Sequence, residues 1–299
     1  MRNRASLALI LAIGFSLSTA WGQSPQLERE DGDPEVPLDI FNLESNYVFE
    51  SDLNHGGKVG EQDAFESQVE YGHRFHLNGN WYLHLGVSYD RFDFGNTAAP
   101  VPIHLQSGAG VIGIDYMKGS DVGAFIEFRP GVYTEEHAGM SSFDCPITVA
   151  RFFVLQQDKL YFLVGVNGSF LRATFPVIPL AGLVWAPTDT IRVLAVPPEP
   201  RVIYSPNKHF SVWVGGEFTG GSFRTDHENT IAPASLSGAV VDYIDYRAGV
   251  GLIYAPNDSV DIDIGGGYSI ERSFNYERAD LYYRTDPAPY VRVQVKVKF

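Results

Sequence analysis

Little in this sequence can form a disulfide, a membrane helix or a nucleic-acid interface. Cys145 is the only cysteine among 299 residues, so no intrachain disulfide can form. After residue 17 no apolar run approaches the roughly 18–20 residues of a membrane helix, so a membrane crossing would have to use strands. Only 22 Lys and Arg residues oppose 36 Asp and Glu residues, for a formal net charge of −14 at pH 7. This excess of anions disfavours nucleic acid as a partner, because phosphates need cations.

The first 37 residues divide into two segments that precede the predicted domain. In residues 1–22, Arg2 and Arg4 are followed by an apolar run and then by Ala20-Trp21-Gly22, the pattern of a secretory signal peptide. Residues 23–37 are polar and acidic without an apolar period, which predicts a disordered periplasmic leader. Residues 38–299 are therefore the expected folded domain.

Extended segments separated by turn residues recur throughout residues 38–299. We expect strands near 38–52, 63–77, 81–91, 107–117, 121–134, 146–156, 160–172, 176–186, 190–196, 201–205, 209–223, 238–254, 260–273 and 289–299. That is about fourteen, an even number, as single-chain bacterial outer-membrane barrels require. The two short pieces around Pro197-Pro198-Glu199-Pro200 are the weakest, and without them the count is about twelve.

The connections alternate between short and long, which bears on the fold class. Turns such as Asn78-Gly79-Asn80 carry the residues that tight turns need. Longer connections, such as residues 92–106 and 274–288, fall between them. Transmembrane barrels have short periplasmic turns and long outer loops. The prediction is thus an all-β chain that forms a transmembrane antiparallel up-and-down β-barrel, with a secreted β-sandwich as the alternative.

The strictest alternation is in residues 290–299. Arg292, Gln294, Lys296 and Lys298 alternate there with an apolar set, namely Val291, Val293, Val295, Val297 and Phe299. One face of this strand is therefore apolar. An apolar face ending in Phe299 resembles the closing strand of bacterial outer-membrane barrels, which implies recognition by the barrel assembly machinery.

A second resemblance covers residues 181–204. Ala-Gly-Leu-Val-Trp-Ala-Pro-Thr-Asp at 181–189 and Pro-Pro-Glu-Pro-Arg-Val-Ile-Tyr at 197–204 resemble an uncharacterised family of bacterial outer-membrane β-barrel proteins. In that family a Gly-x-x-Trp-x-Pro turn precedes a proline-rich hairpin. The resemblance implies a barrel in the outer membrane of a Gram-negative-type bacterium and implies no particular activity.

Alternation also assigns the polar face of each strand to the barrel interior. The residues predicted to line the lumen are Arg74, His76, His84, Asp115, Glu127, Arg129, Arg151, Glu217, Asp245, Arg247, Asp261, Asp263, Arg292, Lys296 and Lys298. Aromatic residues near the ends of the apolar runs are predicted to form interfacial girdles. We expect Asp261 and Asp263 to lie beside Lys296 and Lys298 at the periplasmic mouth. The mixed signs predict weak ion selectivity, tilted toward cations by the overall acidity.

Catalytic and metal sites have little support in the sequence. Glu135-Glu136-His137 and Asp226-His227-Glu228 place carboxylates beside a histidine in two predicted outer loops, but neither has a recognisable nucleophile. We interpret them as solvated acidic loops. His76 and His84 are expected inside the lumen, where Arg74 argues against a metal ion. The sequence also has no glycine-rich phosphate loop. Together with the preceding observations, this leads us to predict no metal, no cofactor and no enzymatic activity.

The function that fits these features best is a passive pore or channel for small solutes. Outer-membrane lipid, the assembly machinery and small solutes are the expected partners. A barrel of about fourteen strands is intermediate in size between barrels that are filled by their own side chains and barrels that contain a water channel. The strand count is therefore compatible with a narrow lumen and with a plugged one. A non-conducting structural or adhesive barrel, or an outer-rim hydrolase, are the alternatives.

Overall fold

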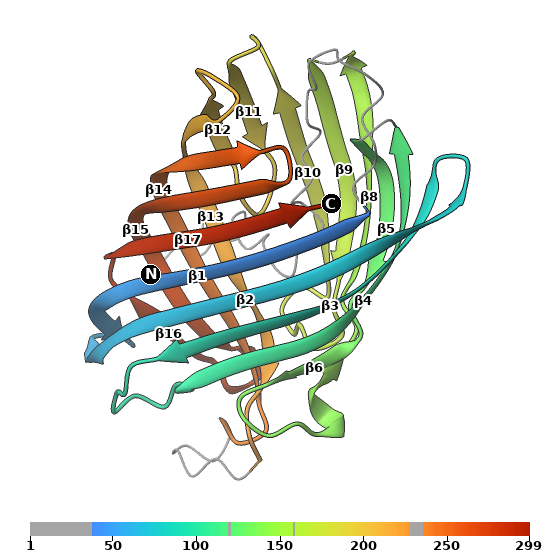
Figure 1. The fold of residues 1–299 in the computed structure, drawn as a ribbon. Helices are drawn as coiled ribbons and strands as arrows, with labels where there is room; N and C mark the ends of the chain where they lie inside the picture. Colours follow the sequence, from blue (N-terminus) through green and yellow to red (C-terminus); the bar gives the residue numbers. More distant parts are fainter. Residues whose placement is uncertain (1–37, 119–120, 158, 228–235) are drawn as a thin grey trace.

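In the computed structural model, residues 38–118, 121–157, 159–227 and 236–299 are described, and they form one β-sheet that closes on itself (Figure 1). The first and last strands pair antiparallel, from Ile40 opposite Lys298 to Val48 opposite Tyr290. Beside this seam the N–H of Asp39 donates to the carbonyl of Phe299 (2.7 Å). Closure into a single sheet confirms the predicted barrel and excludes the sandwich. The predicted signal peptide and leader, residues 1–37, lie outside the described residues.

Seventeen strand segments make up the sheet, and they trace an antiparallel barrel of 14 strands. Their bounds are β1 Asp39–Asn54, β2 Lys58–Asn78, β3 Trp81–Phe94, β4 His104–Lys118, β5 Asp121–Phe128, β6 Gly131–Thr134, β7 Phe143–Asp144, β8 Ile147–Gln156, β9 Leu160–Gly168, β10 Val177–Trp185, β11 Ile191–Ala195, β12 Arg201–Tyr204, β13 Phe210–Arg224, β14 Val240–Asn257, β15 Val260–Tyr276, β16 Leu281–Thr285 and β17 Ala288–Lys298. Two short 3₁₀ helices, η2 (Met140–Ser142) and η4 (Glu277–Ala279), lie in the connections. No helix among the described residues is long and apolar enough to cross a membrane.

Proline explains why there are more segments than barrel strands. β5 and β6 are separated at Pro130, β7 and β8 at Pro146, and β16 and β17 at Pro287. Proline has no N–H to donate to a neighbouring strand, so the hydrogen-bond ladder is interrupted locally. The carbonyl of Pro130 still accepts from the N–H of Gly110 (2.9 Å). Each pair of segments is thus one barrel strand with a proline break.

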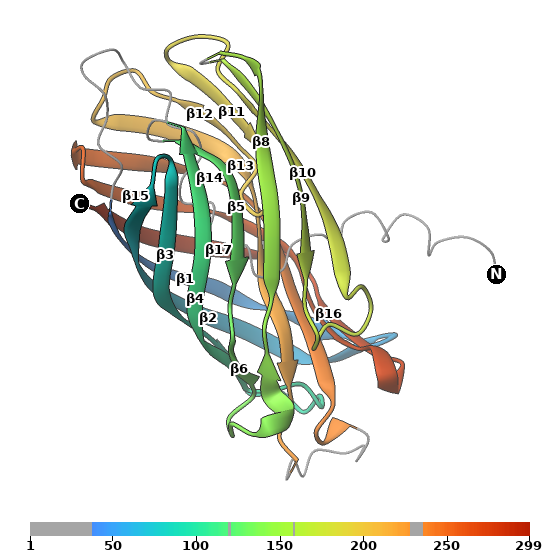
Figure 2. The same cartoon turned by 90° about the vertical axis from the view of Figure 1, so that its right-hand side faces the viewer.

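The two ends of the barrel differ, as predicted, although one connection is shorter than expected. The end that carries the tight turns at 79–80, 205–209 and 258–259 and the C-terminus is called the short-turn end below; the opposite end, with β6 and β16, is the long-loop end (Figure 2). Residues 53–62, which separate the first two predicted strands, form a tight hairpin. β1 and β2 continue pairing there, with Leu53 opposite Gly60, and Gly56 supplies the positive φ of +71° for the turn.

β11 and β12 are true members of the sheet, which excludes the twelve-strand alternative. They pair antiparallel from Ile191 opposite Tyr204 to Leu194 opposite Arg201. Both are much shorter than their neighbours, and their connection, residues 196–200, lies along β13. The N–H of Gly216 donates to Pro200 (2.8 Å) and that of Phe218 to Pro198 (3.0 Å). Because Pro198 is buried, this hairpin ends inside the barrel.

The outer surface of the barrel is apolar. Val87, Val214, Val250 and Ile264 each expose more than half of their surface. Aromatic residues are exposed on this surface as well, namely Trp81, Tyr89, Trp185, Tyr204 and Tyr254. Soluble monomers rarely show so extensive an apolar surface, whereas lipid covers such a band on membrane barrels.

Candidate functional site

The barrel interior contains most of the predicted lumen residues. Buried there are Arg74, His84, Asp115, Glu127, Arg129, Glu217, Asp245, Arg247, Asp263 and Arg292. Asp261, Lys296 and Lys298 are half-buried. His76 is exposed, and its Nε2 donates a hydrogen bond to the carbonyl of Gly79 (2.8 Å). His76 still pairs with Tyr82, and the register irregularity follows it, between His76 and Asn78, so its exposure reflects its position at the short-turn end of β2.

Arg151 was predicted to line the lumen, and this is wrong. Its side chain is exposed on the outer face of β8, and its guanidinium lies over the ring of Phe153, 5.0 Å from the centroid. Ala150 and Phe152 occupy the inner face and pack in an apolar cluster with Leu163. Charge suggested the inner face for Arg151, but the interior is apolar at this point of the barrel.

The centre of the lumen holds an ion-pair network around two arginines. Arg292 donates to Glu217 (2.8 Å), Glu44 (3.0 Å) and Glu199 (2.6 Å). Arg247 contacts the other oxygen of Glu217 (3.3 Å) and also pairs with Asp245 (2.7 Å). Glu217 on β13 therefore joins the two arginines. Both guanidinium groups are fully buried, and buried cations need paired carboxylates of this kind.

Further ion pairs surround this network. Arg129 donates to Glu127 (2.6 Å) and Glu70 (3.0 Å). Arg74 on β2 pairs with Asp115 on β4 (2.7 Å), across the intervening strand β3. The sequence placed most of these residues on the inner face of the sheet, but it did not indicate which of them form ion pairs.

Several residues of this interior were not predicted from the sequence. Glu44 on β1 and Glu66 on β2 are buried, and their spacing of two from the buried Asn42, Asn46 and Ala64 was a usable signal. Glu199 gave no such signal, because it lies in a connection with no strand period.

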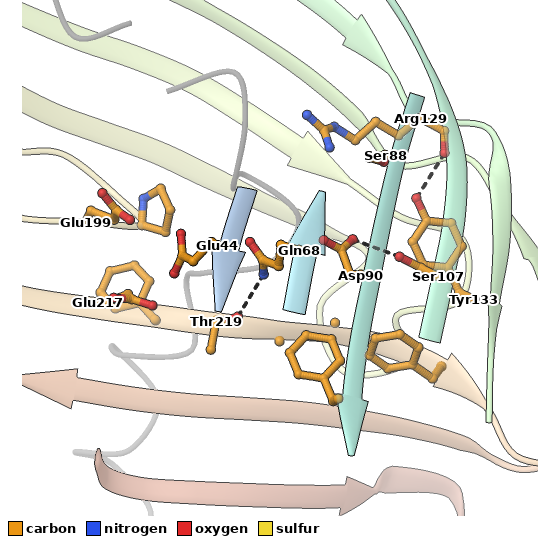
Figure 3. A pocket seen from close by; sticks show the side chains of 16 residues that line it. Glu44, Gln68, Ser88, Asp90, Ser107, Arg129, Tyr133, Glu199, Glu217 and Thr219 are labelled. Carbon is orange, nitrogen blue, oxygen red and sulfur yellow. Dashed lines mark hydrogen bonds between the residues drawn. The ribbon is translucent and has the colours of Figure 1, made fainter. Parts of the chain in front are cut away.

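The short connection that carries Glu199 separates two cavities. The smaller, about 40 Å³, lies toward the long-loop end and has Glu44, Asp90 and Tyr133 in its wall. Figure 3 shows Glu44, Glu199 and Glu217 on one side of it. The larger, about 340 Å³, lies at the short-turn end. Pro198 and Glu199 line both cavities, so this segment is the partition between them.

The larger cavity combines charge with an apolar wall. Its lining includes five cationic residues, Arg192, Arg201, Lys208, Lys296 and Lys298, and three acidic ones, Glu199, Asp261 and Asp263. Arg201 pairs with Asp263 (2.8 Å) and Glu199 (3.2 Å), and Lys298 approaches Asp261 to 3.5 Å. β15 and β17 pair here, with Asp261 opposite Lys296. Leu194, Val196, Ile203 and Ile253 supply apolar surface.

Toward the long-loop end the interior is aromatic and closely packed. Phe92, Phe94, Phe223, Tyr243 and Phe274 are buried in one cluster. Ring centroids lie 5.1 Å apart for Phe92 and Tyr243 and 5.0 Å for Phe94 and Phe274, in edge-to-face geometry. Such contacts exclude water from this part of the lumen.

The loops that follow β6 and β13 meet at the rim of the long-loop end. Thr134 and Arg224 form a parallel bridge, and the N–H of Glu135 donates to the carbonyl of Arg224 (2.9 Å). The carboxylate and histidine motifs that the sequence placed in separate loops are therefore adjacent. Glu228, the last residue of the second motif, lies outside the described residues.

Comparison with known proteins finds similar solved structures at low identity. The chain is similar to an outer membrane channel from Pseudomonas putida F1, with a TM-score of 0.46, 10% identity, and 91% of this chain and 100% of that chain covered. It is also similar to the P. putida toluene transporter TodX (TM-score 0.36, 9% identity, 88% and 90% covered) and to a Pseudomonas aeruginosa FadL homologue (TM-score 0.36, 9% identity, 88% and 90% covered). No family model and no curated protein matches the chain.

Proposed function

We propose that this chain is an outer-membrane channel for small solutes in a Gram-negative-type bacterium, closed in the present conformation by residues 196–200. The observation that carries the proposal is the position of Pro198 and Glu199, which line the cavities on both sides of the partition. The apolar outer surface fits lipid, and the short-turn end would face the periplasm. Enzymatic activity forms no part of the proposal.

The partition is held by contacts that can be exchanged. Glu199 accepts from Arg292 (2.6 Å) and pairs with Arg201 (3.2 Å), and two backbone hydrogen bonds attach the connection to β13. Both arginines have other carboxylate partners, Glu217 for Arg292 and Asp263 for Arg201. Movement of residues 196–200 would therefore leave neither cation without a partner. A solute could then pass between the two cavities.

A second candidate, a barrel that does not conduct, is favoured by a different observation. Fully buried arginines fill the centre of the lumen and an aromatic cluster fills the long-loop end. If these layers are permanent, the barrel serves as a scaffold for its outer loops. The two candidates differ in conductance, which can be measured directly.

The test uses purified, folded protein in planar bilayers. We expect small unitary currents for the wild type and larger or more frequent openings for Glu199→Gln and Pro198→Gly. Glu61→Gln, which changes an exposed glutamate of β2, is the matched control and should behave as the wild type. Silence of all four folded proteins would reject the channel and favour the scaffold.

A further inference from the structure

Two segments that are distant in sequence form a compact unit at the long-loop end. We call residues 134–137 and 224–227 the rim junction. Besides the bridge between Thr134 and Arg224, the N–H of Asp226 donates to the carboxylate of Glu135 (3.0 Å). The loop after β6 is thus fixed against the loop after β13, and the side chains at the junction have a defined arrangement.

Three side chains of the rim junction present possible metal ligands to one point. Glu136, His137 and Asp226 each offer one ligand atom, and these atoms lie within 4.8 Å of one another. His104, at the start of β4, brings its Nε2 to 3.9 Å from a carboxylate oxygen of Glu136. The set therefore combines nitrogen and oxygen donors from three separate parts of the chain, unlike a purely acidic surface cluster.

We propose that the rim junction binds a zinc-like divalent transition-metal ion through Glu136, His137 and Asp226. Zinc accepts His nitrogen and carboxylate oxygen at about 2.0–2.2 Å in tetrahedral sites, so two ligand atoms of one ion lie about 3.4 Å apart. The widest separation in the present set, at most 4.8 Å, has to shrink by up to about 1.4 Å, which rotation of the Glu136 and His137 side chains can provide. Water or His104 would complete a four-coordinate site.

The exposure of the three ligands suits such an adjustment. The side chains of His137 and Glu136 are mostly exposed, so they can rotate without disturbing the barrel. Asp226 is the fixed member, because its carboxylate accepts from the N–H of His137 (3.0 Å) and pairs with the His137 ring (2.7 Å). Burial opposes the ionisation of Asp226, but hydrogen bonds from His137 and from the N–H of Glu136 outweigh it and lower its pKa. An ionised carboxylate is the form that binds a metal ion.

The imidazole makes the proposed site selective. Ca²⁺ and Mg²⁺ take oxygen ligands almost entirely, whereas imidazole suits Zn²⁺, Ni²⁺ and Cu²⁺. A bound ion would join the ends of β6 and β13 across the mouth of the barrel. It would therefore stabilise the folded state, because the unfolded chain does not hold these residues together.

The experiment is calorimetric titration of tag-free, folded barrel with ZnCl₂, and separately with CaCl₂ and MgCl₂. We expect one Zn²⁺ per chain and no heat of binding for the other two ions. His137→Ala and Asp226→Asn should each weaken zinc binding at least tenfold. His55→Ala, which removes an exposed histidine from another loop of the same end, is the matched control and should leave zinc binding unchanged.

A second readout keeps the test independent of any folding defect. Zn²⁺ should raise the thermal unfolding midpoint of the wild type and of His55→Ala, and should leave that of His137→Ala unchanged. His137 is in an exposed loop, so this variant should fold. Absence of zinc binding to the wild type would overturn the proposal, as would full binding by folded His137→Ala and Asp226→Asn.

Discussion

Replacing Arg292 with methionine should be among the most destabilising single changes in this barrel. The guanidinium is fully buried and donates to Glu44, Glu199 and Glu217, whose carboxylate oxygens lie within 4.8 Å of one another. Removing one partner of a buried ion pair typically costs about 3–5 kcal/mol, because the remaining charge is left buried and uncompensated. Glu217 keeps Arg247 (3.3 Å) and Glu199 keeps Arg201 (3.2 Å). We therefore expect Arg292→Met to lose about 3 kcal/mol, the lower end of that range.

The measurement is the free energy of unfolding in denaturant, for barrel folded into lipid or detergent. Arg151→Met is the matched control, because it makes the same substitution on the outer face of β8, and its effect should be within about 0.5 kcal/mol of zero. Adding Glu44→Gln to Arg292→Met should recover part of the loss by removing one carboxylate. A loss below about 1 kcal/mol for Arg292→Met would contradict the reasoning, because the network would then contribute no more than a surface ion pair does.

Three further predictions concern assembly, topology and ion preference. Deleting Phe299, whose backbone pairs with Asp39 at the seam, should reduce the heat-modifiable folded barrel in outer membranes; an unchanged amount would reject a role for the terminal strand in assembly. A tag inserted at Thr97 should be accessible on intact cells and one at Gly79 should not, whereas the reverse pattern would invert the proposed orientation. Reversal potentials in planar bilayers should show anion preference for open channels, and Asp261→Asn should strengthen it; cation preference would refute the argument from the cavity charges.

Much of the fold could be predicted because a β-strand has a sequence period of two. Every predicted strand has a counterpart in the sheet, including the doubtful pair β11 and β12. The long strands also extend beyond their predicted ends, as β2 does by starting at Lys58. Turn residues mark the positions at which a chain can reverse. The chain does not reverse until the pairing between the two neighbouring strands stops. That pairing is a tertiary property, which no local pattern contains.

The site was less predictable, because alternation gives the face of a residue and not its partners. Arg74 and Asp115 were both assigned to the lumen, yet nothing in their local sequence indicated that they pair. Arg151 shows the opposite error, since Arg151 is exposed and the apolar Phe152 beside it is buried, so both side chains lie on the face opposite to the one their polarity indicates. Glu199 could not be found from alternation, because it lies in the connection between two short strands.

The cavity at the short-turn end also changes the expected ion preference. From the sequence, the net charge of −14 predicted a tilt toward cations. Exposed charges act over about 8–10 Å at physiological salt, whereas charges in a narrow lumen with low-dielectric walls act strongly on an ion between them. The walls of this cavity carry five cationic and three acidic side chains, a local excess of two positive charges. Two of the three acids, Glu199 and Asp263, already pair with Arg201. An ion that enters from the short-turn end therefore meets a positive field, although the chain as a whole is acidic.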